Sequence, residues 1–310
     1  MMTQRLTSRR LTSAAIYLLS GALGLVAFIY PFFVPVVAPD RAWAHGQDAP
    51  LLTAALVGFS VLALMVELQG RSLSAKTVAM LGVLVAVTSV LRFLETAFPM
   101  PGGFSPIFAP IMIAGYVFGG RFGFLMGTFT LLASALITGG VGPWLPYQMY
   151  TAGWAGLTAG WLRSLASAVR RPRSGRVSRP GVGAGHLSED CGQARTRWSI
   201  LTLCIFGFIW GLLYGAIVNV YFWPFAGGPA EQTWAPGIGL GETLARYAAF
   251  YVVTSLAWDL ARAVGNVALI LLLGAPMVKA LERFRRRFNF EVGDIGQRAG
   301  STQEEAGIRV

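Results

Sequence analysis

Long apolar stretches recur along almost the whole chain, and they restrict it to proteins whose solvent is the lipid bilayer. A helix needs about 20 mostly apolar residues to cross about 30 Å of hydrocarbon. The composition agrees, because 55% of the 310 residues are hydrophobic, 13% are charged and the mean hydropathy is +0.58. The sequence predicts an all-α integral membrane protein with about eight transmembrane helices, near residues 14–38, 51–68, 77–94, 105–120, 122–138, 144–162, 198–223 and 243–275.

Basic residues lie in every second connection between these stretches. Arg and Lys occur before the first stretch and after the second, fourth, sixth and eighth. The alternate connections contain a single basic residue, Arg41. Because Lys and Arg accumulate in cytoplasmic loops, we expect a cell-membrane protein with both termini in the cytoplasm. The net charge of +11 is then a topology signal that also contacts anionic lipid. It does not require nucleic acid as a partner.

Residues that could support catalysis or a metal site are sparse. The two histidines, His45 and His186, fall in loops on opposite sides of the predicted membrane. The chain has no Gly-rich phosphate-binding loop ending in Gly-Lys-Ser/Thr. We therefore expect no catalytic residue, no metal site and no cofactor, and we do not expect an enzyme.

The helix expected over residues 77–94 carries two different surfaces. At about 100° per residue, small side chains form a stripe along one face, which favours close contact with another helix. Arg92 and Glu95 lie roughly opposite, toward the outer end, where a polar face favours a cavity. A mutual ion pair between Arg92 and Glu95 is the structural alternative. The small stripe comprises Ala75, Ala79, Gly82, Ala86 and Ser89.

The last apolar segment, residues 242–276, is too long for one span, because about 34 residues at about 1.5 Å each extend about 50 Å. Counting about 20 residues back from its inner end leaves residues 242–255 as a separate element of the outer loop. Asp259, Arg262 and Asn266 then form a polar stripe in the outer half of the last helix. This stripe either contacts a ligand or contains a structural ion pair.

Aromatic and amide side chains gather in the outer connections, at residues 139–148 and 219–224. Single aromatic residues at a membrane boundary are usually interfacial anchors. Together with amides and charges, they also describe a ligand pocket with apolar walls and a few polar groups. The predicted substrate site comprises Arg92, Glu95, Trp144, Tyr147, Gln148, Asn219, Trp223, Asp259, Arg262 and Asn266.

Glycines and prolines predict how several helices meet. The turn Gly119-Gly120-Arg121 is short enough only for a helical hairpin, and the preceding segment is interrupted by Pro106 and Pro110, so it must face protein or a cavity. Small-xxx-small repeats permit close helix contact, and packing inside one bundle is the simplest explanation for them. These repeats are Gly156 with Gly160, and Gly207 with Gly211 and Gly215.

Several stretches resemble the substrate-specific S component of energy-coupling factor (ECF) transporters. They are Leu91-Arg92-Phe93, residues 114–123 (AGYVFGGRFG), residues 139–149 (GGVGPWLPYQM) and residues 258–266 (WDLARAVGN). The similarity covers residues 76 to about 285. Its most specific part is the run Gly-Pro-Trp-Leu-Pro-Tyr-Gln at residues 142–148.

The resemblance implies a six-helix core that binds a vitamin or metal ion from outside and docks on a membrane T component driven by two ATPases. It also implies docking through small residues written Ala-x-x-x-Ala, which Ala75 and Ala79 match and Gly82 and Ala86 continue. The lack of pocket histidines and the aromatic outer loops favour a small organic micronutrient, such as an aromatic heterocycle or a cobalamin-like cofactor, over a metal ion.

The chain is accordingly divided into five parts. Residues 164–197 contain many Arg, Ser, Gly and Pro residues and little apolar content, which is typical of disorder. The parts are a two-helix membrane extension at 1–70, core helices one to four at 71–163, a disordered basic cytoplasmic linker at 164–197, core helices five and six at 198–285, and a disordered cytoplasmic tail at 286–310.

Two other functions remain open at this point. An ion-coupled secondary transporter for a small organic solute could use Asp259 as a proton-linked carboxylate, and it predicts internal repeats. A polytopic membrane enzyme acting on lipids needs a nucleophile or a metal cluster. The sequence has no convincing repeat between its halves and no such cluster.

Overall fold

The computed structural model describes residues 15, 18, 19, 21–32, 44–69, 75–98, 104–169 and 184–305, and every regular element in this part of the chain is a helix. The all-α fold predicted from the sequence is therefore confirmed. The arginines between residues 170 and 183, those near the N-terminus and the last residues of the tail lie outside the described residues.

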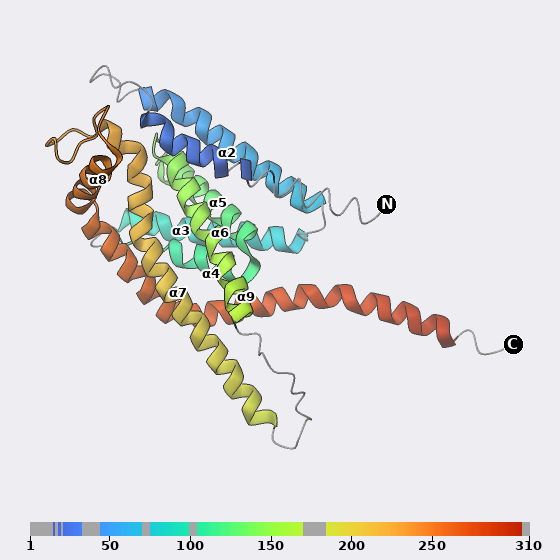
Figure 1. Cartoon of the computed structure of the whole chain (residues 1–310). Coiled ribbons are helices and arrows are strands. Elements are labelled where there is room, and N and C mark those ends of the chain that lie inside the picture. The colour runs from blue at the N-terminus through green and yellow to red at the C-terminus, as the bar shows by residue number, and fades with distance from the viewer. Residues whose placement is uncertain are drawn as a thin grey trace.

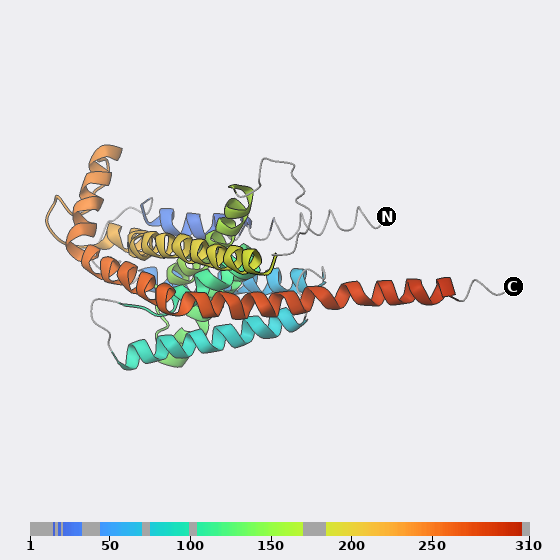
Figure 2. The ribbon, with the colours of Figure 1, turned by 90° about the horizontal axis from the view of Figure 1, so that it is seen from below.

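Six helices form the predicted core (Figure 1). Within the described residues, four segments are long and apolar enough to cross a membrane, at Ala75–Ala97, Gly120–Thr138, Thr196–Phe225 and Leu256–Arg287. Figure 2 shows α3 at the edge of the bundle and α9 extending beyond it. The core helices are α3 (Ala75–Ala97), α4 (Phe108–Phe118), α5 (Gly120–Thr138), α6 (Leu145–Val169), α7 (Ala184–Phe222) and α9 (Leu256–Glu305).

Helix α4 is shorter than the predicted span over 105–120 and lies buried in the bundle. It has 11 residues, which extend only about 16 Å. It begins after Pro106, and Pro110 stands in its first turn, where a missing N–H costs no intrahelical bond. Neighbouring helices cover it, and the hydroxyls of Tyr116 and Ser199 of α7 lie 2.9 Å apart. The prediction that this segment faces protein is confirmed.

Close glycine contacts join α4, α5 and α6. Gly119 has a φ of 106°, a conformation that favours glycine, and it makes the tight turn of the predicted α4–α5 hairpin. A Cβ on Gly123 of α5 would collide with the backbone of Gly156 in α6, and a Cβ on Gly156 would collide with Gly123. The small faces therefore bring the helix backbones into contact, as predicted.

Helices α7 and α9 pack through a second set of glycines. A Cβ on Gly211 would collide with the backbone of Ala263, and one on Gly215 would collide with the carboxylate of Asp259. The repeat in α7 thus serves packing inside the bundle, which was the simplest expectation. It also places the polar stripe of α9 directly against α7.

Polar contacts define one end of the bundle, which we call the basic end. Arg163 of α6 and Arg285 of α9 each donate a hydrogen bond of 2.9 Å to the carbonyl of Val117 at the end of α4. Arg163 also lies 3.5 Å from the carboxylate of Glu282. The opposite end, which we call the loop end, carries residues 139–144, the 3-10 helix η4 (Trp223–Phe225) and α8 (Leu240–Thr254).

Helices α8 and α9 are separate elements. The chain breaks at Ser255, which caps α8, so the prediction of a distinct element over 242–255 is confirmed. Figure 1 shows α8 at one extremity of the bundle, where α9 begins. Tyr251 of α8 donates a hydrogen bond of 3.1 Å to the carbonyl of Leu212 in α7.

Two N-terminal elements lie beside the core. They are a helical segment over residues 21–32, which ends in the 3-10 helix η1 (Tyr30–Phe32), and α2 (Ala44–Gln69). Phe28 lies between Tyr147 and Trp154 of α6, with ring centroids 5.0 and 5.8 Å away. Gly24 faces Trp154 and Tyr150, where a Cβ would be too close. The extension therefore covers one side of α6.

Two helices reach into segments predicted to be disordered. Helix α7 begins at Ala184, inside the predicted linker, and α9 continues to Glu305, inside the predicted tail. Neither extension contains a proline, which would break the helix. Adding a turn to a helix that has already formed is also far easier than nucleating a new one. The five-part division of the chain stays a prediction.

Candidate functional site

A cavity of about 210 Å³ lies at the loop end, between α3, α5, α6 and the connection that precedes α6. Its walls combine apolar side chains with a guanidinium, an amide and several hydroxyls. Three of the ten predicted site residues line it, namely Arg92, Trp144 and Gln148. The remaining lining residues are Thr96, Leu131, Ser134, Ala135, Thr138, Gly140 and Leu145.

Arg92 is the one charged residue among those that line the cavity. Its Nη1 lies 4.0 Å from Oε2 of Glu95, at the limit of an ion pair. The same Glu95 oxygen accepts a hydrogen bond of 2.7 Å from Ser105. The Arg92 side chain makes no hydrogen bond to another described residue, so the five N–H donors of its guanidinium are available to a molecule in the cavity.

Trp144 and Gln148 supply an aromatic surface and an amide. Trp144 is 44% exposed, and its indole N–H donates to the carbonyl of Gly140 at 3.2 Å. Gln148 lies one helical turn further along α6, and its side-chain amide makes no hydrogen bond to another described residue. The amide can therefore both donate to and accept from a molecule in the cavity.

The hydroxyls of the cavity are partly engaged with the backbone. Ser134 and Thr138 of α5 donate to the carbonyls of Leu131 and Ser134, at 3.0 and 2.8 Å. Thr96 donates to the carbonyl of Arg92 at 3.0 Å. Their oxygens can still accept hydrogen bonds, but Arg92 and Gln148 are the donors that a ligand would meet.

Asp259 and Arg262 form a buried ion pair at the start of α9. Nη1 of Arg262 contacts Oδ1 of Asp259, whose side chain is only 2% exposed. The guanidinium lies over the rings of Tyr214 and Phe108, at 5.1 and 5.9 Å from their centroids. Oδ2 of Asp259 and Nε of Arg262 have no hydrogen-bond partner among the described residues. The pair joins α9 to α7 and α4.

Two predicted amides bridge helices instead of lining the cavity. Asn266 of α9 donates a hydrogen bond of 3.0 Å to the carbonyl of Gly207 in α7. Asn219 at the end of α7 donates to Ser255, between α8 and α9, at 2.5 Å. Both contacts hold the last helices together.

The aromatic residues Tyr147 and Trp223 are fully covered. Tyr147 stacks on Tyr221 of α7, with ring centroids 4.0 Å apart and an interplanar angle of 7°. Trp223 donates through Nε1 to the carbonyl of Gln232 at 2.8 Å. Phe32 of the N-terminal extension lies against Trp223 at 6.0 Å. The sequence offered no signal for these extension contacts, because single phenylalanines occur throughout the apolar stretches.

Helix α8 packs against Trp223 through Tyr247. The ring of Tyr247 lies edge-on to Trp223 at 5.0 Å, and its hydroxyl donates to the carbonyl of Ala216. Burial raises the pKa of the Tyr247 hydroxyl above its ordinary value. The hydroxyl therefore stays protonated at neutral pH and keeps its role as a donor.

The predicted polar stripes of α3 and α9 have different surroundings. Arg92 lines the cavity, whereas Arg262 is bound to Asp259. The structure thus divides the ten predicted residues into cavity residues, a neighbouring acid and a set of contacts between helices.

The small stripe of α3 faces outward. Ala75, Ala79, Gly82 and Ala86 are exposed, and a Cβ on Gly82 would meet nothing within 4 Å. Only Ser89 is buried, where it donates to the carbonyl of Thr130 at 3.3 Å. An open apolar groove of about 330 Å³ between α3 and α5 includes Gly82.

The chain belongs to a known family. A family model described as "ECF transporter, substrate-specific component" matches residues 76–274, which is the core from α3 into α9. No curated protein and no solved structure gives a significant match. The protein is therefore a substrate-specific component of an ECF transporter, and it is a multi-pass membrane protein. Among the described residues, no group of three or more His, Cys, Asp or Glu side chains could hold a metal ion.

Proposed function

We propose that this S component captures a small organic micronutrient with a carboxylate group on the outer face of the cell membrane. The observation that carries the proposal is the cavity at the loop end, where Arg92 and Gln148 present free hydrogen-bond donors beside Trp144. A substrate-specific component needs a pocket for its substrate. The side chains that line this pocket indicate the kind of substrate.

The orientation rests on charge. Arg163, Glu282 and Arg285 meet at the basic end, and Lys76 and Arg121 stand in the first turns of α3 and α5. By the positive-inside rule this end is cytoplasmic, so the loop end and its cavity face outward. With an even number of spans, both termini lie in the cytoplasm.

The charge and the size of the cavity support this substrate class. A guanidinium donates two parallel hydrogen bonds to a carboxylate, and no acid lines the cavity to compete. A cavity of about 150 Å³ accepts benzene, so 210 Å³ fits a single ring with a carboxylate. A cobalamin-like substrate, as favoured alongside other heterocycles in the sequence analysis, would extend well beyond this cavity.

The predicted residues then have two roles. Arg92, Trp144 and Gln148 contact the substrate, and Glu95 orients Arg92 from the side. Tyr147, Asn219, Trp223, Asp259, Arg262 and Asn266 position the helices around the cavity through the contacts described above. Because Asp259 is held by Arg262, it is poorly suited to the proton-linked carboxylate of a secondary transporter.

Transport requires partners that provide energy. We propose that the chain docks on an ECF T component driven by two ATPases, through the exposed stripe of Ala75, Ala79, Gly82 and Ala86. The stripe supports this because its small side chains leave α3 open to a close approach. The described part of the N-terminal extension packs on α6, and the four stripe residues remain exposed in this part of the structure.

Binding of matched probes to the purified protein tests the proposal. Benzoate and nicotinate should bind more tightly than benzamide and nicotinamide, which have the same shape without the charge. Arg92→Gln should weaken carboxylate binding by about 10- to 100-fold, because a hydrogen bond to a charged group is worth about 1.5–3 kcal/mol. Arg246→Gln removes a cation of α8 that pairs with Glu242, and it should leave binding unchanged. Equal affinity for acids and amides would refute the carboxylate class.

A further inference from the structure

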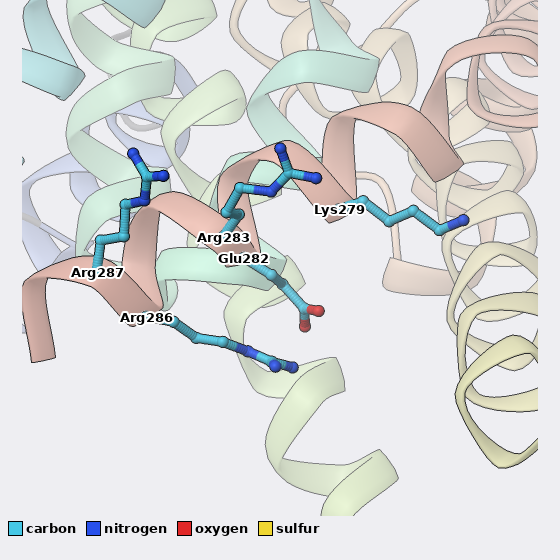
Figure 3. Close-up of a pocket in the computed structure, with 5 residues that line it drawn as sticks. All are labelled: Lys279, Glu282, Arg283, Arg286 and Arg287. Carbon is cyan, nitrogen blue, oxygen red and sulfur yellow. The ribbon is translucent and has the colours of Figure 1, made fainter. Parts of the chain in front are cut away.

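The part of α9 at the basic end carries a cluster of cations around a hollow of about 450 Å³. Figure 3 shows Arg283 and Arg287 extending to one side of the helix, Glu282 and Arg286 to another, and Lys279 along it. We call Lys279, Arg283, Arg286 and Arg287 the α9 cations. They follow directly after the apolar part of the helix.

Neighbouring basic residues are already used inside the protein, whereas the α9 cations are not. Arg163 and Arg285 bind the carbonyl of Val117, and Arg163 also pairs with Glu282. Glu282 is the one acid among the residues that line the hollow. None of the α9 cations has an ion-pair or hydrogen-bond partner among the described residues. Four cations therefore line one hollow with no protein counter-ion among the described residues.

The depth of the cluster matches lipid headgroups. If the hydrocarbon ends near Pro276, Lys279 lies about 5 Å and Arg287 about 16 Å further along the axis, at about 1.5 Å per residue. Helical side chains lean toward the N-terminus of their helix, which in this part of α9 means back toward the membrane. Long Arg and Lys side chains at a helix end therefore reach the headgroup layer.

An apolar surface continues the same face into the membrane. At about 100° per residue, Leu272, Lys279, Arg283 and Arg286 lie within about 60° of one another around the helix. Leu272 is 73% exposed. This face thus offers an apolar strip followed by cations, which complements an acyl chain followed by a phosphate. A soluble polyanion or an acidic protein segment would contact the cations alone, whereas a lipid bound by the cations would also lie along this apolar strip, which belongs to a candidate membrane span.

We propose that the α9 cations bind the phosphate of an anionic phospholipid, with an acyl chain along the Leu272 face of α9. In the orientation proposed above, the site faces the cytoplasmic leaflet, where anionic lipids attract basic segments. The bound lipid anchors the end of α9 whose Arg285 and Glu282 hold α4 and α6.

The experiment measures lipid binding by the full-length protein in neutral detergent micelles, by native mass spectrometry and by titration. Dioleoylphosphatidylglycerol should bind, and dioleoylphosphatidylcholine should bind at least tenfold more weakly. Arg283→Gln with Arg286→Gln should weaken phosphatidylglycerol binding at least tenfold. Arg283→Lys with Arg286→Lys keeps the charge and should retain most of it. Leu272→Ser should weaken binding severalfold.

A charge-matched control tests whether lipid binding depends on this site or only on the net charge of the protein. Arg197→Gln with Arg246→Gln removes two cations elsewhere and should change binding less than twofold. Inorganic phosphate at tens of millimolar should compete poorly; if it displaces the lipid fully and binds alone with the same dependence on Arg283 and Arg286, the site is one for free anions. If the Gln pair keeps lipid binding but loses ATPase association, the cations are a protein contact and the proposal is wrong. None of these outcomes depends on substrate capture at the loop end.

Discussion

Two arginine–carboxylate pairs with the same i, i+3 spacing differ sharply in this bundle. Arg92 and Glu95 of α3 lie 4.0 Å apart with 26% and 21% of their side chains exposed, beside a cavity. Asp259 and Arg262 of α9 are in direct contact, with exposures of only 2% and 15%. The first pair leaves N–H donors of Arg92 available to a ligand, whereas the residues of the second pair bind each other and join helices. Spacing alone therefore identifies a pair, and the packing around it decides its role.

The largest effect is expected where α7 and α9 touch. Gly211→Leu places a side chain where even a Cβ would collide with the backbone of Ala263, so the two helices cannot keep their contact. We expect loss of monodisperse protein in size-exclusion chromatography after extraction in mild detergent. Gly82→Leu is the matched control, because a Cβ there meets nothing within 4 Å, and it should stay folded. A well-behaved Gly211→Leu protein would contradict the close packing.

Two single variants on α3, Gly82→Leu and Ala79→Trp, should fold but should not assemble with the partner subunits. Both changes place bulky side chains on the exposed stripe of α3, where the T component is proposed to approach closely. We expect loss of co-purification with the T component and the ATPases, while carboxylate binding by the isolated subunit is retained. If both variants assemble and transport at the wild-type rate, the stripe does not serve docking.

Breaking the buried pair should destabilise the protein strongly. Arg262→Ala leaves Asp259 as an unpaired buried charge, which costs about 3–5 kcal/mol, and the loss should be visible in thermal unfolding. Asp259→Asn with Arg262→Gln removes both charges and should recover most of this stability. If the pair is structural, the double variant also keeps ligand affinity. Recovered stability with lost binding would instead return α9 to the substrate site.

Much of the fold could be predicted from the sequence because its signals are local. The break between α8 and α9 follows from segment length against bilayer thickness, and the hairpin at Gly119 follows from a short Gly-rich turn. The length of α4 was overestimated, because apolar composition over 105–120 does not distinguish a full span from a short buried helix. Only packing shows that α4 is covered by other helices.

The site was less predictable because polar stripes have two possible uses. Arg92 and Asn266 both follow from helical periodicity, but only the arrangement of helices shows that Asn266 bonds to Gly207 while Arg92 lines a cavity. The contacts of Phe28 and Phe32 join residues far apart in the chain. No local pattern in the sequence could indicate such partners.

The smallest effect, and the finest test of the comparison, concerns Trp144 and Gln148. Gln148→Ala and Trp144→Ala should each weaken carboxylate binding by about 1–3 kcal/mol, the scale for a lost hydrogen bond or aromatic contact. Neither change should alter the unfolding temperature much, since Trp144 is 44% exposed and the Gln148 amide has no hydrogen-bond partner among the described residues. Asn266→Ala offers the opposite profile, because it removes the bond to Gly207 and should lower stability while sparing affinity. Isothermal titration and thermal unfolding on the same preparations separate the two profiles. A Gln148→Ala protein that loses stability but binds normally would give Gln148 a structural role like that of Asn266 and leave Arg92 as the main hydrogen-bond donor to the ligand.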